Sequence, residues 1–301
     1  MASIRVTGLF AVATVALGVA LALPARAAAN EYEERVPAQA GGKLVVKLFT
    51  GSVEIEAHAG LEVVAEARAT GGGSAGVVFA LTGDGKDSKF TAEDGRWVGV
   101  PFMSWPKVEV RLRVPESYSV DVQTTGGTIE LMRLGGAVVA NTSGGTIEVE
   151  QVQGVVDVRT SGGSIRLDKI RGNVVAKTSG GSIRVAEVDG KLDIETSGGS
   201  IRVDEAQGPV EARTSGGSIS VTFAKAPKGD LRTSGGSIEA EFPRASGVNL
   251  DARTSGGRVL VESSIKTTGS AERSRIEGEI NGGGENLLLR TSGGNIRVRE
   301  R

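Results

Sequence analysis

The sequence predicts an all-β fold, a single-stranded parallel β-solenoid (β-helix) with coils of roughly eighteen residues and an all-β N-terminal lead-in and cap. Three observations predict this fold. A Thr-Ser-Gly-Gly box recurs at a constant spacing of eighteen positions, apolar residues alternate with polar ones between boxes, and 45 of the 301 residues are glycine while only 4% are aromatic. Stacked aliphatic ladders need few aromatic side chains, and each coil of a solenoid is stabilised by its neighbours.

Residues 1–27 predict a secretory signal peptide, because a short basic start and the uncharged stretch 6–23 precede small residues at Ala-x-Ala spacing. We expect cleavage after Ala27, and cleavage after Ala29 fits the same pattern. An uncleaved anchor is the alternative, since the apolar stretch just reaches spanning length, but Pro24 favours cleavage. No later segment is long and apolar enough to cross a membrane. The protein is therefore expected to be exported, and to be periplasmic, on the cell surface or extracellular.

Residues 28–121 predict a β-rich lead-in and cap that is continuous with the solenoid. Alternating apolar residues predict strands, and residues 49–55 look like a weak first member of the repeat. Trp97 and Trp105 fall in one segment that predicts a protruding loop. The two tryptophans could seat a ligand or plug the end of the solenoid, and the sequence does not decide between these roles. The predicted strands cover residues 44–48, 53–56, 61–67 and 107–114.

Residues 122–301 predict the repeat solenoid itself. The first six boxes keep a constant step of eighteen, and later steps of nineteen, twenty-one and thirty-seven predict lengthened loops. Eighteen residues are also five helical turns, but two or three glycines per unit would each cost about 1 kcal/mol in a helix. The period-2 alternation of β-branched residues indicates strands instead. The boxes begin at Thr124, Thr142, Thr160, Thr178, Thr196, Thr214, Thr233, Thr254 and Thr291.

A regular apolar position between the two strands of each unit distinguishes a solenoid from an antiparallel meander. In a hairpin turn this residue would face water, whereas in a solenoid it points inward; it is Leu134, Val152, Ile170, Val188 or Ala206 in successive units. Glycine is expected at the corners because it reaches positive φ without a Cβ penalty. The predicted turn residues are Gly144, Gly145, Gly162, Gly163, Gly180, Gly181, Gly190, Gly198, Gly199, Gly216 and Gly217.

The alternating segment 108–114, Pro115, the strand 120–122 and the serial boxes together resemble the bacterial putative adhesin domain family, over roughly residues 40–301. The resemblance implies an exported or envelope-associated β-solenoid with a non-enzymatic role. It carries no catalytic residue across to this chain.

Composition excludes several functional classes. Thirty-five basic residues nearly balance 36 acidic ones, which gives no electrostatic case for nucleic acid. The chain has no cysteine and one histidine, His58, so we expect no metal site, no cofactor and no Ser-His-Asp catalysis. A polysaccharide-active β-helix enzyme is the least favoured class, because the acids follow the repeat without the local break that an active site introduces.

The best candidate for a ligand surface is a ladder formed by Arg166, Arg184 and Arg202, one residue past the box isoleucine in consecutive coils. Such a ladder could bind an anionic envelope glycan or surface polymer, and a solvated face with Asp168 and Asp204 offsetting the charge is the alternative. A second, mostly basic row has acids two residues earlier, which predicts cross-strand pairing and no ligand. The box hydroxyls are expected to satisfy the turn backbone. The second row is Arg159, Lys177, Glu195, Arg213, Arg232, Arg253 and Arg290.

The sequence thus favours an exported module that binds an anionic envelope glycan, a surface polymer or another envelope protein. The alternative is a self-assembling extracellular scaffold, in which coils stack end to end. On this view residues 295–301 form the last coil, and the three arginines in this segment would blunt its edge.

Overall fold

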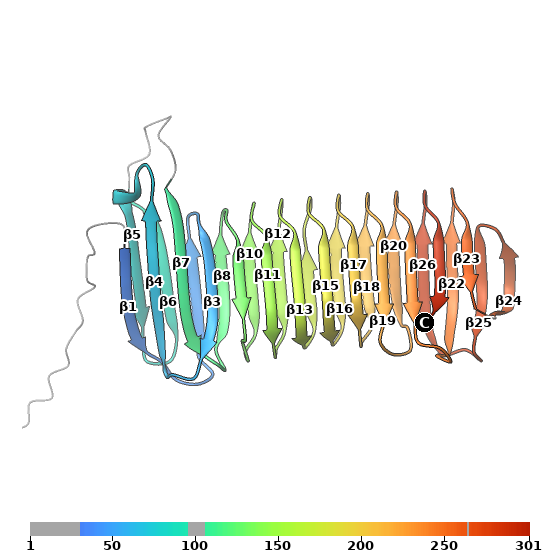
Figure 1. Ribbon diagram of the computed structural model, residues 1–301, viewed down its shortest axis with the longest axis horizontal. Helices are drawn as coiled ribbons and strands as arrows, with labels where there is room; N and C mark the ends of the chain where they lie inside the picture. Colours follow the sequence, from blue (N-terminus) through green and yellow to red (C-terminus); the bar gives the residue numbers. More distant parts are fainter. Residues whose placement is uncertain (1–30, 96–105, 264) are drawn as a thin grey trace, which may run out of the picture.

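The computed structural model describes residues 31–95, 106–263 and 265–301, and these residues form the predicted parallel β-solenoid. Two long sheets run side by side along a straight rod, and most neighbouring strands within each sheet are parallel (Figure 1). We call the 13-stranded sheet A and the 14-stranded sheet B. A single short 3₁₀ helix, Ser74–Gly76, interrupts the strands of the described residues. No helix there has the length and apolar character that crossing a membrane requires.

The strands of sheet A, in spatial order, are β1 (Glu31–Pro37), β4 (Glu62–Thr70), β7 (Lys107–Pro115), β3 (Ser52–His58), β9 (Ile129–Met132), β11 (Ile147–Val152), β13 (Ile165–Arg171), β15 (Ile183–Asp189), β17 (Ile201–Ala206), β19 (Ile219–Phe223), β21 (Ile238–Phe242), β27 (Ile296–Glu300) and β23 (Val259–Glu262).

The strands of sheet B, in spatial order, are β5 (Val77–Gly83), β6 (Ser88–Asp94), β2 (Lys43–Leu48), β8 (Ser119–Thr124), β10 (Val138–Thr142), β12 (Val156–Thr160), β14 (Val174–Lys177), β16 (Leu192–Thr196), β18 (Val210–Thr214), β20 (Gly229–Thr233), β26 (Glu285–Thr291), β22 (Val248–Thr254), β25 (Arg275–Ile280) and β24 (Ile265–Glu272).

Each regular coil contributes one strand to sheet B, turns at its Thr-Ser-Gly-Gly box, and contributes the next strand to sheet A. The pairing keeps the register of the sequence repeat, so that Thr142 lies beside Thr160 and Ile147 beside Ile165. The core is a column of aliphatic ladders between the sheets. The apolar corner residues belong to this column, with 2% or less of their surface exposed, as the solenoid requires and a meander would not; they are Leu134, Val152, Ile170, Val188 and Ala206.

The lead-in strands extend the same two sheets. β2 pairs in parallel with β8, and β3 with β9, so that residues 49–51 form the turn of a first coil, where the Thr124 hydroxyl donates to the Gly51 carbonyl. Beyond this coil the outer strands β1, β4 and β5 run antiparallel to their neighbours. Tyr32, Phe79 and Phe90 pack at this end with ring centroids 5.8–6.2 Å apart. Trp97, Trp105 and the predicted signal peptide lie outside the described residues.

The C-terminal strands are not the last coil of the rod, so the prediction for residues 295–301 is wrong. β26 lies between β20 and β22, and β27 lies between β21 and β23. The Ile238 amide donates to the Asn295 carbonyl, and the Ile296 amide donates to the Arg258 carbonyl, both at 2.9 Å. The chain thus leaves a gap one coil wide, builds the outermost coil from β22 and β23, folds back through the antiparallel hairpin β24–β25, and fills the gap last.

Close stacking, and not positive φ, requires the second glycine of each box. A Cβ on these glycines would lie 1.5–2.1 Å from the carbonyl oxygen of the matching glycine in the preceding coil; they are Gly145, Gly163, Gly181, Gly199 and Gly217. None of them has positive φ, so the conformational reason expected from the sequence is wrong for this position. At the opposite corner, Gly190 has φ of 155°, and its Cβ would lie 2.2 Å from the Gly172 oxygen.

The first glycine of each box is under much weaker steric constraint. A Cβ there would lie 3.2–3.8 Å from the nearest backbone atom in the coils of Gly144, Gly162, Gly180, Gly198 and Gly216. Left-handed backbone occurs instead at non-glycine residues just before the apolar corner, with φ of 59° at Arg133, 57° at Gln151 and 54° at Lys169.

Candidate functional site

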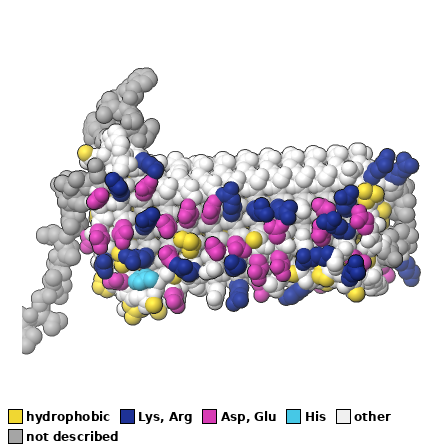
Figure 2. Space-filling view, viewed as in Figure 1, with side chains coloured by type: hydrophobic (Ala, Val, Ile, Leu, Met, Phe, Trp, Pro, Cys, Tyr) yellow, Lys and Arg dark blue, Asp and Glu magenta, His cyan; other side chains and the backbone are white. Residues whose placement is uncertain are grey.

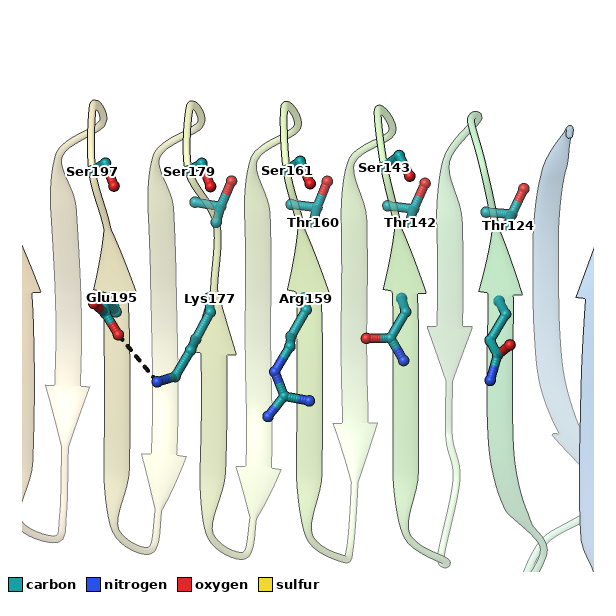
Figure 3. A pocket seen from close by; sticks show the side chains of 13 residues that line it. Thr124, Thr142, Ser143, Arg159, Thr160, Ser161, Lys177, Ser179, Glu195 and Ser197 are labelled. Carbon is teal, nitrogen blue, oxygen red and sulfur yellow. Dashed lines mark hydrogen bonds and ion pairs between the residues drawn. The ribbon is translucent and has the colours of Figure 1, made fainter.

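A shallow groove of about 660 Å³ follows the outer face of sheet B, just below the box turns of strands β8 to β16 (Figure 3). Three parallel rows of side chains form it, and successive members of each row come from successive coils. The threonine row is Thr124, Thr142, Thr160 and Thr178; the serine row is Ser143, Ser161, Ser179 and Ser197; and the long-side-chain row is Gln123, Asn141, Arg159, Lys177 and Glu195.

The threonine hydroxyls are structural. The Thr160 hydroxyl donates to the Gly145 carbonyl of the preceding coil at 2.9 Å and accepts the Gly163 amide of its own turn at 3.3 Å. The same pair of bonds recurs at Thr178 in the next coil. The side chains are buried, and both hydrogen-bonding functions are used, as expected for hydroxyls that satisfy a turn.

The serine hydroxyls of the groove are free. Ser143, Ser161, Ser179 and Ser197 are exposed, and their Oγ atoms have no hydrogen-bond partner within the described residues. The serine three positions later in each box differs, since Ser164 Oγ accepts the Ser182 amide at 3.3 Å. The sequence alone could not separate these two hydroxyl rows, because both belong to the same repeated box.

The long-side-chain row changes in character along the groove. The side-chain amides of Gln123 and Asn141, which sequence reasoning did not single out, have no partner among the described residues. Farther along, Lys177 Nζ lies 3.0 Å from Glu195, and Arg159 lies 2.9 Å from Asp157. The groove therefore offers free hydroxyls and amides beside half-exposed cations, a combination that suits a polar chain lying along the rod.

The predicted arginine ladder does form, on the opposite sheet. Arg166 lies beside Arg184, and Arg184 beside Arg202, on strands β13, β15 and β17. Carboxylates offset the charge of all three: Arg166 is 2.5 Å from Glu148, while Arg184 and Arg202 are 3.4 and 2.6 Å from Asp204. Asp168, which was expected to contribute, lies against Lys169 instead.

Acidic side chains continue the ladder toward the N-terminal end. Glu54, Glu130 and Glu148 occupy the same row on adjacent strands, so that a run of acids precedes a run of bases along the face that carries His58 (Figure 2). Glu54 pairs with Arg111, and Glu148 with Arg166. Glu130 lies between them, where partial burial and then the charges of Glu148 and Glu54 raise the pKa of its carboxyl.

The upper edge of the rod in Figure 2 is a long strip without charged or hydrophobic side chains. It corresponds to the serines and glycines of the box turns. Among the described residues, no cluster of three or more His, Cys, Asp or Glu side chains has the arrangement of a metal site. His58 holds its own loop, since its Nδ1 accepts the Gly60 amide and its Nε2 bonds to the Glu62 carbonyl.

The chain was compared with curated proteins and with solved structures. No curated protein matches the chain. Among solved structures, a protein described as a putative adhesin from Bacteroides fragilis is 11% identical with a TM-score of 0.43, covering 89% of this chain and 97% of that one. A protein described as a putative cell adhesion protein from Clostridium sporogenes is 9% identical with a TM-score of 0.26, covering 90% and 100%. At these scores neither structure carries an argument about this chain.

The sequence match is more decisive, because it runs through the lead-in and the whole repeat region, over residues 43–299. It confirms the resemblance that the alternating segment before Pro115 and the serial boxes indicated. The chain belongs to the Toastrack DUF4097 family.

Proposed function

We propose that the protein is an exported, non-enzymatic binding module of the cell envelope or cell surface, which holds an extended polar polymer along the outer face of sheet B. The groove carries this proposal, because an unpartnered serine hydroxyl recurs there in four successive coils, beside the unpartnered side-chain amides of Gln123 and Asn141. The predicted signal peptide at residues 1–27 supports export.

A polymer fits the groove better than a small molecule does. Small-molecule sites are concave and bury most of the ligand, whereas this groove is shallow and open along the rod. Neighbouring strands are about 4.8 Å apart, so its donors and acceptors repeat at roughly the length of one sugar unit in an extended glycan. Its carboxylate, Glu195, pairs with Lys177, which leaves no acid and base poised for glycoside hydrolysis in the groove.

The test uses the mature chain from Ala28 on a glycan array and on purified envelope fractions. A variant with Asn141→Ala, Ser161→Ala and Ser179→Ala removes free groove groups, and Ser220→Ala with Thr222→Ala is the matched control on sheet A. We expect the wild type and the control to bind envelope material and the groove variant to bind more weakly. Absence of wild-type binding to every array glycan and envelope fraction would overturn the proposal.

The scaffold alternative receives less support from the ends of the rod. β1 and β5 at one end, and the hairpin β24–β25 of sheet B at the other, include antiparallel pairings that interrupt the parallel register which end-to-end stacking would continue, whereas β23 ends sheet A as a parallel strand. We therefore expect a monomer in sedimentation at all concentrations, and concentration-dependent polymers would favour the scaffold instead.

A further inference from the structure

Five arginines lie side by side on the outer face of sheet B, on the adjacent strands β18, β20, β26, β22 and β25. The register pairs Arg213 with Arg232, Arg232 with Arg290, Arg290 with Arg253, and Arg253 with Arg275. We call these five residues the arginine row. The order along the row differs from the order in the sequence, because the inserted strand β26 places Arg290 between Arg232 and Arg253, and the antiparallel strand β25 adds Arg275.

Carboxylates lie along one side of the row, and the register places Glu195 next to Arg213 at one end and Glu272 next to Arg275 at the other. Arg232 is held by two hydrogen bonds to Asp230, at 2.7 and 2.5 Å, and Arg253 by two to Asp251, at 2.6 and 2.9 Å. Arg290 shares Asp251 at 3.3 Å. These acids precede their arginines by two residues and so form the next row of the sheet. The other side of the arginine row is lined by exposed serines and has no acid; these serines are Ser215, Ser234, Ser292 and Ser255.

The acids leave part of each guanidinium unused. In Arg232, Arg253, Arg275 and Arg290 the bonds to carboxylates use Nε or Nη2, and Nη1 has no partner within the described residues. The five side chains remain 40–47% exposed. A guanidinium carries five N–H donors in a rigid planar fork. The carboxylates therefore fix four neighbouring forks in place while leaving donors available to a second oxyanion.

We propose that the arginine row binds a linear acidic polysaccharide with one carboxylate per sugar, lying along the rod axis. The proposal rests on the proposed function in taking the outer face of sheet B as the ligand surface. Successive arginines are about 4.8 Å apart along a nearly straight line, as neighbouring strands are. Duplex DNA carries one charge per about 1.7 Å of its axis on a curved cylinder, which matches a flat ladder poorly. Planar carboxylates suit the guanidinium fork, which binds them bidentately.

Because the acid row lies beside the arginine row, recognition depends more on the spacing of the ligand's carboxylates than on long-range attraction between charges. The row of carboxylates cancels much of the arginine charge at a distance, so a compact anion gains little from approaching this face. A chain long enough to touch all five arginines at once gains one contact per coil. We therefore expect binding to rise steeply with oligomer length up to about five sugars, at the strand spacing of about 4.8 Å, and to weaken with added salt.

The experiment immobilises the mature protein and measures its binding to polygalacturonate and to galacturonate oligomers of defined length. The test variant combines Arg232→Gln, Arg290→Gln and Arg253→Gln. The matched control combines Arg166→Gln, Arg184→Gln and Arg202→Gln, which removes the same charge at the same spacing from sheet A. A third variant replaces the three sheet B arginines by lysine, which retains the charge and loses the fork. Thermal unfolding checks that each variant folds.

We expect the sheet B glutamine variant to bind polygalacturonate at least about tenfold more weakly, since each substitution removes a charge-assisted, bidentate contact to a carboxylate of the polymer. The sheet A control should stay near wild type, and the lysine variant should lie between. Equal losses in both glutamine variants, tighter binding of single-stranded DNA than of polygalacturonate, or no wild-type binding would overturn the proposal. Envelope binding that survives in the sheet B glutamine variant would overturn only this site and would leave the proposed function standing.

Discussion

Replacing Gly181 by alanine is expected to destabilise the solenoid strongly, whereas the same change at its neighbour Gly180 is not. A Cβ on Gly181 would lie 1.9 Å from the Gly163 carbonyl oxygen of the preceding coil. A Cβ on Gly180 would lie 3.5 Å from its nearest neighbour, the Gly162 oxygen, which is ordinary contact. Neither glycine has positive φ. The two substitutions thus differ in contact with the neighbouring coil and not in backbone conformation.

The size of the destabilisation by Gly181→Ala follows from the displacement of the two coils that the added Cβ requires. Cβ atoms essentially never approach another heavy atom closer than 3.0 Å, so the two coils must separate by about 1 Å at the turn. This separation disturbs the bond from the Thr178 hydroxyl to the Gly163 carbonyl, at 2.8 Å, and that from the Gly180 amide to the Ser161 carbonyl, at 2.9 Å. Each hydrogen bond contributes about 1 kcal/mol and overpacking costs about 1–3 kcal/mol, which gives about 3–5 kcal/mol in all.

Urea unfolding of the mature chain, followed by far-UV circular dichroism, measures the difference. Gly181→Ala should lower the unfolding midpoint clearly, whereas Gly180→Ala should leave it unchanged or raise stability by about 0.4–1 kcal/mol, as alanine does where the native backbone accepts it. Fragment-specific proteolysis separates local opening of the affected coils from global unfolding, because repeat proteins can open in parts. Equal midpoints for the two variants would refute the close-stacking argument.

Three further predictions concern other parts of the chain. Burial raises the pKa of the Glu130 carboxyl, so the ionised carboxylate lowers the stability of the fold once the pH rises through that pKa. Glu130→Gln should therefore raise the melting temperature at neutral pH and leave it unchanged below about pH 4. A change in melting temperature that does not depend on pH would contradict this. Lys169→Asn should stabilise by about 0.5 kcal/mol in urea unfolding, because asparagine tolerates left-handed backbone better; a loss of stability would count against it. Mass spectrometry of the exported protein should find an N-terminus at Ala28 or Asn30, and an intact Met1 in a membrane fraction would exclude cleavage.

The regular part of the fold could be predicted from the sequence because one period sets both register and burial. The constant repeat step places Arg166 beside Arg184, and an apolar corner such as Val188 can only be buried if the chain coils. The position of the last coil could not be predicted in this way. The box at Thr291 has the same pattern as its neighbours, so it fits beside any coil, and only the connections decide that it lies between Thr233 and Thr254.

The candidate site was less predictable from the sequence, because the repeat defines the rows of side chains and not their hydrogen bonds. Register identifies which side chains share a row, but not which of their polar atoms are already bonded. Ser161 and Ser164 belong to the same repeated box, yet only the Ser164 hydroxyl is hydrogen-bonded within the described residues. The repeat placed Arg213, Arg232, Arg253 and Arg290 in one row, to which the sequence assigned no ligand. Arg275 and the position of Arg290 between Arg232 and Arg253 could not be predicted, because β25 and β26 are out of sequence order.

The out-of-order insertion of β26 and β27 makes this end of the rod depend on the synthesis of residues 285–300. While a nascent chain still lacks residues 285–300, the coil of β22 and β23 lacks its native neighbours β26 and β27, and the vacant slot exposes the ladders of β20 and β21. If β22 and β23 dock directly on β20 and β21 during this interval, they must detach again before the final strands can enter. Insertion of β26 and β27, and not progressive winding from the N-terminus, is therefore the event that locks this end of the structure. A chain truncated before residue 285 would present unpaired strand edges to proteases and to other chains.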